Sequence, residues 1–168
     1  MGTGHSILAR MSDRLAALYP AHLKTVIERH DKALAATRFD SVVIAAGEPI
    51  YAFLDDNTYP FRPNPHFKHW VPVTTNPHCF VVYKPGAKPM LVYWQPVDYW
   101  YKPAGAPSGF WVEHFDIRVI GDPADADQHL PKSGNIAVIA EQWGNTTAQF
   151  GLSTIGTHHL NCGLGRKG

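Results

Sequence analysis

The chain has 168 residues, of which 45% are hydrophobic and 17% are charged, and its formal net charge is +1. This length indicates one domain with room for a sizeable core, and the composition is that of an ordinary globular protein. Because 15 Lys and Arg residues balance 14 Asp and Glu residues, the chain lacks the basic excess that is typical of nucleic-acid binding.

The N-terminal residues 1–14 are expected to form a loose leader, and the domain is expected to occupy residues 15–155. The first apolar run, residues 7–9, is interrupted by Arg10. No uninterrupted apolar stretch approaches the roughly 18–20 residues of a membrane span, and no secretory signal is visible. The sequence therefore predicts no membrane partner.

A helix is predicted over residues 21–37. Pro20 directly before it suits the first turn of a helix, where the missing N–H costs nothing. Five side chains recur at the spacing of one helical face: Leu23, Val26, Ile27, His30 and Leu34. One histidine supplies too few ligands for a metal ion, so we interpret His30 as a partly buried helix residue.

Five segments are predicted to be β-strands. Residues 41–46 form a continuous β-branched and apolar run, which is typical of a strand buried on both faces. Residues 79–83 and 90–94 flank the Pro-Gly turn at 84–88 and predict a hairpin. Residues 115–120 alternate as in a half-exposed strand, with Phe115, Ile117 and Val119 on the inward side. Residues 135–140 read as another buried strand. Helix and strands together predict a layered α/β domain.

The last third of the chain adds two short helices and a tail. Asp122 and Pro123 predict the capped start of one helix. Residues 146–150, ended by Gly151, predict the other. Residues 156–168 contain several glycines and no periodicity, so this tail is expected to be frayed.

Two aromatic segments stand out, residues 53–61 and residues 94–100. Each combines aromatic, proline and acidic residues, and neither shows the spacing of a strand or a helix. Residues 55–76 also form a long Pro-, Asn- and His-rich stretch, which we expect to be a loop. Aromatic loops that prolines hold in place favour a role in binding.

Few residues point to catalysis. Asp55 and Asp56 could act as acid and base, bind a metal or cap a turn, but adjacent carboxylates in a loop usually point apart. A metal site has plausible ligands at His66, His69, His78 and Cys79, without a second pair at a familiar spacing. His158, His159 and Cys162 form a weaker candidate in the tail. No nucleophile elbow, phosphate loop or dinucleotide motif is present.

The two cysteines, Cys79 and Cys162, do not form a disulfide framework in a chain of this length. Cys79 lies within an apolar run and is expected to be a small buried side chain. This cysteine usage favours a reducing compartment, and we expect the protein to be cytoplasmic.

Several longer motifs together resemble the N-terminal domain of bacterial Xaa-Pro dipeptidases (prolidases), a branch of the creatinase and aminopeptidase P superfamily that includes organophosphorus acid anhydrolases. The resemblance spans about residues 15–155. The motifs are Leu18-Tyr19, residues 41–46, Phe53-Leu54-Asp55-Asp56, Tyr59-Pro60-Phe61, residues 64–68, residues 70–73 and Pro96-Val97-Asp98-Tyr99-Trp100.

The resemblance implies a mixed β-sheet flanked by α-helices, and a lid that also forms a homodimer. It implies that Asp56 faces the free amino terminus of an Xaa-Pro dipeptide and that Trp100 walls the substrate pocket across the dimer. Asp98 and Tyr99 would position the Trp100 loop, and His66 and Trp70 would order the long loop before it.

In this family, catalysis belongs to a C-terminal domain that binds two metal ions, usually manganese. The characteristic runs of that domain are absent from these 168 residues. We therefore expect a dipeptidase domain truncated before its catalytic partner, without a catalytic residue, metal or cofactor of its own. Two other hypotheses stay open: a stand-alone binding or assembly module that uses the aromatic loops, and a small metalloprotein that uses the histidines at 66–79.

Overall fold

The fold is built on a mixed five-stranded sheet. The structure, a computed structural model, describes residues 4–54, 56–96 and 105–141. The strands are β1 (Ser41–Ala45), β2 (Phe80–Tyr83), β3 (Met90–Trp94), β4 (Asp116–Ile120) and β5 (Ile136–Ile139), in the order β4-β3-β2-β1-β5. β1 runs parallel to β5, and β3 runs parallel to β4, whereas the pairs β1–β2 and β2–β3 are antiparallel. The predicted α/β class with a mixed sheet is confirmed.

The strongest strand predictions are also confirmed. β1 lies between β2 and β5, and all of its residues are buried, as expected for its continuous apolar run. β2 and β3 form the predicted hairpin around the turn at Gly86, whose φ of 79° is one that side chains larger than glycine rarely adopt.

The two outer strands depart from their predicted burial. In β4 the predicted inward residue Val119 is 53% exposed, and Ile120 is the one that is buried. In β5 only Val138 is buried. Both strands lie at the ends of the sheet, where one side of each strand lacks a neighbouring strand among the described residues. Alternation along the sequence could not reveal this position.

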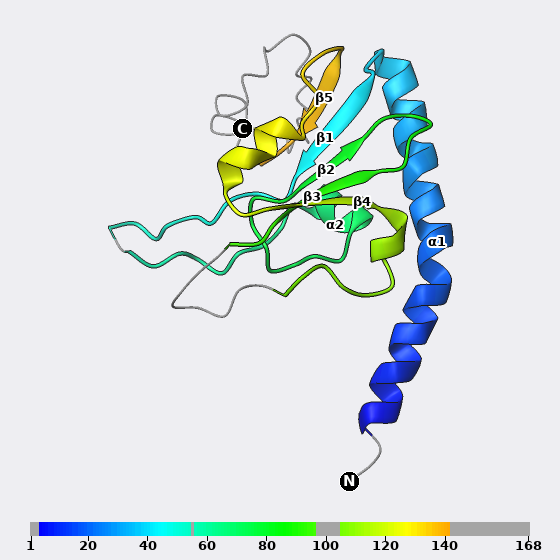
Figure 1. Cartoon of the computed structure of the whole chain (residues 1–168), viewed down its shortest axis with the longest axis vertical. Helices are drawn as coiled ribbons and strands as arrows, with labels where there is room; N and C mark the ends of the chain where they lie inside the picture. The colour runs from blue at the N-terminus through cyan, green and yellow to red at the C-terminus, as the bar shows by residue number, and fades with distance from the viewer. Residues whose placement is uncertain (1–3, 55, 97–104, 142–168) are drawn as a thin grey trace, which may run out of the picture.

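The helix α1 (Gly4–Thr37) is much longer than predicted. The prediction that it begins near residue 21 is wrong, because Pro20 lies inside the helix instead of in its first turn. Residues 4–14, expected to be a loose leader, are the first turns of α1. This N-terminal part extends beyond the rest of the described chain, at the bottom of Figure 1.

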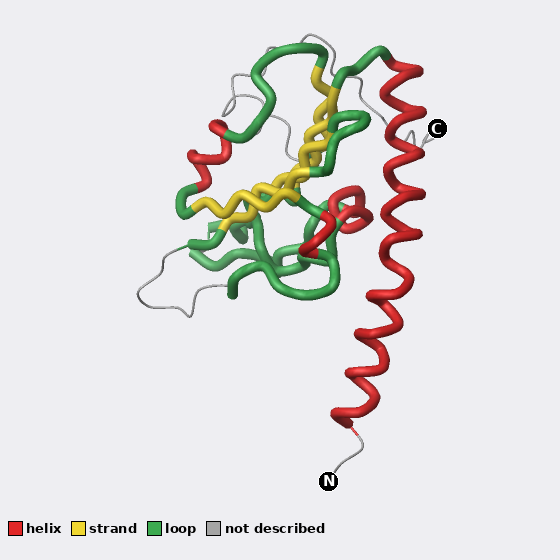
Figure 2. The backbone as a smooth tube through the Cα atoms, turned by 45° about the vertical axis from the view of Figure 1, so that its right-hand side comes forward, coloured by secondary structure: helices red, strands yellow, loops and turns green. Residues whose placement is uncertain are grey.

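Two layers cover the sheet. α1 and the short helix α2 (Pro65–Trp70) lie on one face, and the 3-10 helix η2 (Pro123–Gln128) lies on the other, as Figure 2 shows. The larger core forms between α1, α2 and one sheet face, and includes Leu23, Trp70 and Tyr83. The smaller core forms on the opposite face and includes Phe80 and Leu130.

Two short helices illustrate local capping. η2 begins as predicted, with the Asp122 carboxylate accepting a hydrogen bond from the N–H of Ala124 at 2.8 Å. α2 was missed, since its stretch was predicted to be a loop. It begins in the same way, with the Asn64 side chain accepting from the N–H of His66 and Pro65 in the first turn. A further 3-10 turn, η1 (Val112–His114), leads into β4.

The predicted helix at 146–150 and the tail at 156–168 lie outside the described residues. Over the part of the chain that is described, no helix has both the length and the apolar character needed to cross a bilayer.

Candidate functional site

The first aromatic segment forms a projecting arm, which we define as residues 50–61 and call the aromatic arm. Its two sides are joined by a bridge between Tyr51 and Thr58. The N–H of Ala52 donates to the Asn57 carbonyl at 2.9 Å, and the N–H of Tyr59 donates to the Ile50 carbonyl at 2.8 Å. The arm is the cyan and teal loop that points away from the sheet on the left of Figure 1.

The arm exposes its apolar side chains instead of packing them. Phe53 is 87% exposed, Leu54 is 91% exposed and Tyr51 is 69% exposed. Leu54 also has a φ of 56°, a left-handed conformation that is uncommon for a residue other than glycine. Exposed apolar groups gathered on one projection mark a site of interaction.

Asp56 lies on this arm and is exposed. No ion pair joins it to another described residue. Its neighbour Asp55 lies outside the described residues, as do Asp98, Tyr99 and Trp100. The structure therefore places Asp56 on an accessible projection. That Asp56 faces the amino terminus of a substrate, and that Trp100 walls the substrate pocket across a dimer, stay predictions.

Trp70 is buried in the core. Its ring lies 5.1 Å from that of Tyr83 and 4.8 Å from that of His30, and its carbonyl accepts a hydrogen bond from the Tyr19 hydroxyl. Its indole N–H has no hydrogen-bond partner among the described residues. Trp70 thus fastens α2 to α1 and the sheet, whereas His66, on the same helix, is exposed.

His30 occupies the interface between α1 and α2. Its Nδ1 lies 2.8 Å from the Val26 carbonyl, a geometry in which the ring N–H donates. Burial lowers its pKa from the ordinary value of 6.5, and the nearby His66 and His69 act in the same direction. The interpretation of His30 as a partly buried helix residue agrees with this position.

The histidines and cysteine at 66–79 do not converge on a metal site. His78 packs against Trp94, with ring centroids 5.0 Å apart. Cys79 is fully buried, its sulfur accepts the Trp94 N–H at 3.4 Å, and burial raises the pKa of its thiol to about 12. A thiolate ligand is therefore disfavoured. Among the described residues, no group of three or more His, Cys, Asp or Glu residues could hold a metal ion.

A pocket at the base of the aromatic arm was not predicted. It has a volume of ≈250 Å³, and its lining includes Glu48, Tyr59, Arg62 and Glu141. Glu48 follows β1 and Glu141 follows β5, and these strands are parallel, so both carboxylates reach the same edge of the sheet. The carboxyl ends of parallel strands are a common place for ligands, but the sequence alone does not show that these two strands are neighbours.

Comparison with known proteins gives the family. The sequence model described as the N-terminal domain of Xaa-Pro dipeptidase matches residues 17–156. An Xaa-Pro dipeptidase of Xanthomonas campestris pv. campestris (strain B100) is 45% identical over 128 residues, which are 76% of this chain and 29% of that protein.

Two further relatives have the same printed name, Xaa-Pro dipeptidase. The one from Xanthomonas oryzae pv. oryzae (strain MAFF 311018) is 40% identical over 136 residues, 81% of this chain and 31% of its own length. The one from Pseudoalteromonas translucida (strain TAC 125) is 40% identical over 130 residues, 77% of this chain and 30% of its own length. The chain thus spans less than a third of these relatives, and it belongs to the family of Xaa-Pro dipeptidase N-terminal domains.

Proposed function

We propose that this chain is the part of an Xaa-Pro dipeptidase that covers the substrate and joins two subunits. The observation that carries the proposal is the aromatic arm, because Phe53 and Leu54 are almost fully exposed on a hydrogen-bonded projection. Such groups gain free energy when a partner removes them from water. The partner in this proposal is a second copy of the enzyme.

Asp56 has a specific role in the proposal. Its accessible carboxylate pairs with the free ammonium group of an Xaa-Pro dipeptide bound to the neighbouring subunit. Trp100 forms a wall of the same pocket, with Asp98 and Tyr99 positioning its loop. His66 and Trp70 order the chain between the two aromatic segments. The support for these roles is the family match over residues 17–156 and the exposed position of Asp56.

Peptide hydrolysis, in this proposal, takes place in a C-terminal catalytic domain that binds two manganese ions. The relatives support this division, since the chain corresponds to only 29–31% of the length of those named above. The described residues do not offer a fitting metal site of their own. We therefore expect the isolated chain, supplied with manganese, to leave Gly-Pro and Leu-Pro intact, and hydrolysis by the isolated chain would contradict the proposal.

A chimeric enzyme tests the role of Asp56. Residues 17–156 would replace the corresponding domain of the Xanthomonas campestris relative, and the steady-state kinetics would be measured with Gly-Pro. Loss of a charge-assisted hydrogen bond costs about 1.5–3 kcal/mol, so Asp56→Asn should raise KM about tenfold or more and change kcat less. The matched control is Glu28→Gln, an exposed carboxylate on α1. An unchanged KM for Asp56→Asn would contradict the pairing of Asp56 with the ammonium group of the substrate.

The exposed arm also supports a second function, a stand-alone assembly module. In that case the isolated chain would form a defined oligomer without a catalytic domain. Sedimentation velocity tests the second function, because the module predicts a stable oligomer of the isolated chain that Phe53→Ser weakens. A strict monomer at all concentrations would count against the module.

We place the protein in the cytoplasm. The support is Cys79, which is a free, buried thiol, as expected in a reducing compartment.

A further inference from the structure

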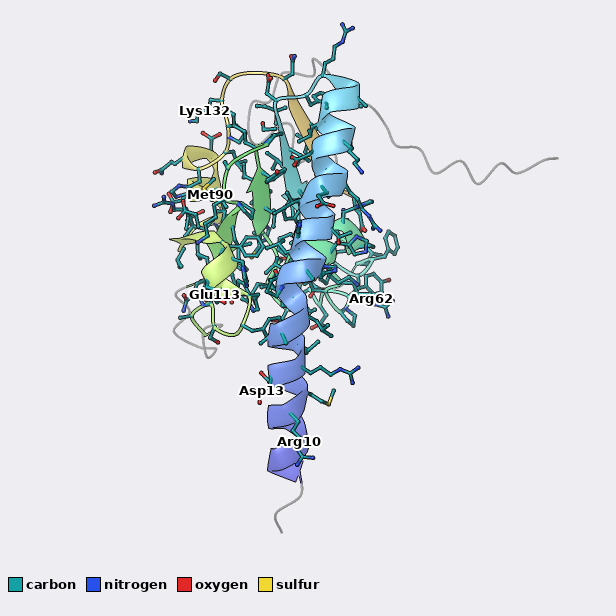
Figure 3. The ribbon with its side chains drawn as sticks, turned by 90° about the vertical axis from the view of Figure 1, so that its right-hand side faces the viewer. Arg10, Asp13, Arg62, Met90, Glu113 and Lys132 are labelled. Carbon is teal, nitrogen blue, oxygen red and sulfur yellow. The ribbon has the colours of Figure 1, made fainter. Side chains whose placement is uncertain are left out.

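The N-terminal part of α1 carries an apolar stripe that the domain leaves uncovered. Met11 is 57% exposed, Leu15 is 50% exposed and Leu18 is 56% exposed. Their spacings of four and three residues place them on one side of the helix. This is the part of α1 that extends past the sheet, where Figure 3 labels Arg10 and Asp13.

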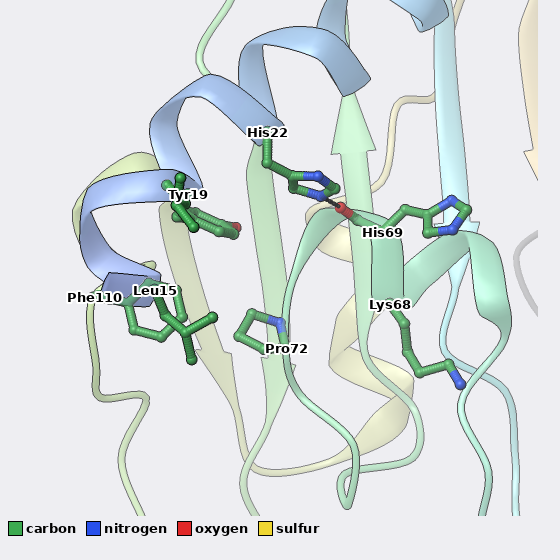
Figure 4. A pocket seen from close by; sticks show the side chains of 8 residues that line it. Leu15, Tyr19, His22, Lys68, His69, Pro72 and Phe110 are labelled. Carbon is green, nitrogen blue, oxygen red and sulfur yellow. Dashed lines mark hydrogen bonds between the residues drawn. The ribbon is translucent and has the colours of Figure 1, made fainter. Parts of the chain in front are cut away.

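The stripe leads into a hollow between α1 and α2, which we call the α1 groove. Leu15, Leu18 and Tyr19 line it from α1, and Pro72 and Phe110 complete its apolar wall. Its volume is ≈270 Å³. Figure 4 shows Leu15 beside Phe110, with Pro72 on the opposite side of the hollow.

Hydrogen bonds and ring contacts fix the walls of the α1 groove. The Tyr19 hydroxyl donates to the carbonyl of Trp70, and the Tyr19 ring meets the Phe110 ring edge-on at 5.3 Å. Nε2 of His22 lies 2.7 Å from the His69 carbonyl oxygen, and a ring N–H can donate across this distance. The groove is therefore preformed, which lowers the entropic cost of filling it.

Among the described residues that line the α1 groove, the charged side chain is basic. Lys68 lies at its rim with His22 and His69, and the lining contains no acidic residue. Because successive helix residues turn by about 100°, Arg14 falls beside Leu18 and Asp13 falls on the opposite side of α1. Neither Arg14 nor Lys68 forms an ion pair with another described residue.

We propose that the α1 groove and its stripe bind an amphipathic helix of another protein, one with acidic residues beside an apolar stripe. Side chains at the observed spacing match those of a helix that lies in a groove. The basic rim favours an acidic partner, and it disfavours a second copy of this chain, whose stripe has the same Arg14 beside it. The proposal does not depend on dipeptidase activity, and Met11 and Leu15 precede the family match.

Fluorescence anisotropy with a designed peptide tests the proposal on the full chain. The probe is a labelled helical peptide of about 18 residues with leucines at one helical face and glutamates on both flanks. The matched peptide carries lysines in place of the glutamates. We expect saturable binding of the acidic peptide alone, weakened when the salt concentration rises from about 0.05 M to about 0.5 M.

Variants locate the binding surface. Leu15→Ser with Leu18→Ser should abolish binding, and Arg14→Glu or Lys68→Glu should weaken it about tenfold or more. Lys24→Glu is the matched charge reversal, because Lys24 lies on the far side of α1 and should leave binding unchanged. All the altered residues are exposed, and circular dichroism checks that each variant folds.

Three results of the peptide titration would overturn the proposal. They are the absence of saturable binding by the acidic peptide, equal binding of the lysine peptide, and equal weakening by Lys24→Glu. Self-association of the chain that disappears in the double serine variant would identify a second copy as the occupant, and it would overturn the proposal as well.

Discussion

Burial determines which proton-transfer chemistry is open to the titratable side chains around α2. Tyr83 shows the effect. Burial raises its pKa to about 12, and a hydrogen bond of 2.6 Å to the Asp31 carboxylate acts in the same direction. A tyrosine in this state keeps its proton and works as a donor, and the bond ties α1 to β2. Tyr83 and Asp31 therefore contribute to holding the helix against the sheet.

His30 gives the fold a dependence on pH. Burial holds its folded-state pKa below 6.5, so between that pKa and about 6.5 the unfolded chain binds more protons than the folded one. The free energy of unfolding should therefore fall as pH drops through about 6.5, and level off below the folded pKa. Urea denaturation between pH 5 and pH 8 would measure it, roughly within the window in which histidine titrates.

The variant His30→Gln isolates this contribution. It should flatten the pH dependence, although His78 retains part of it because burial lowers its pKa too. His129→Gln serves as the control for loss of a histidine elsewhere. An unchanged slope in His30→Gln would show that other groups cause the pH dependence.

Pro20 lowers the stability of the helix α1, because it lies inside the helix. Proline inside a helix removes one backbone hydrogen bond and clashes with the preceding turn, at a cost of about 3 kcal/mol relative to alanine. Pro20 is exposed, so its side chain contributes little packing. Pro20→Ala should therefore raise the free energy of unfolding by about 1–3 kcal/mol in urea denaturation.

A proline outside the helices provides the comparison for that variant. Pro85 lies in the exposed turn between β2 and β3, where its fixed φ suits the backbone, so Pro85→Ala should be neutral or slightly destabilising. If Pro20→Ala destabilises the chain, the helix does not pass through Pro20 in solution.

The elements that could be predicted are those whose signal is local. The all-apolar run of β1 and the Pro-Gly turn of the β2–β3 hairpin depend on neighbouring residues, and both were found. The start of α1 was missed because Pro20 is a strong local signal that the surrounding helix formers override. α2 was missed because a helix of 6 residues is too short to show a period, although Asn64-Pro65 is a capping signal.

The molecule consists of a packed body, the sheet with its helices, and of the aromatic arm that projects from it. The sequence indicated the aromatic segments by their composition, and Asp56 by a family motif. It could not indicate the pocket that joins Glu48 to Glu141, because the two residues are far apart in sequence and meet only through the parallel pairing of β1 with β5. The α1 groove escaped prediction for the same reason, since α1 and Phe110 meet only in the folded chain.

This separation predicts that the aromatic arm can be shortened without loss of the fold. Tyr51 and Thr58 already pair, so replacing residues 52–57 with Asn-Gly leaves a two-residue hairpin turn. Phe53 and Leu54 pack no core, and their removal should change the free energy of unfolding by less than about 0.5 kcal/mol. Trp70→Ala, which empties a fully buried site, should cost about 3–5 kcal/mol in the same urea titration.

Shortening the arm should nevertheless remove the contribution that the domain makes to substrate binding in the chimeric enzyme. Without Phe53, Leu54 and Asp56, the chimera should lose most of its kcat/KM for Gly-Pro, while its thermal midpoint stays within a few degrees of the parent. Stability and activity that fall together would mean that the arm belongs to the folded body. Full activity in a stable, shortened chimera would mean that the substrate is covered by another part of the chain.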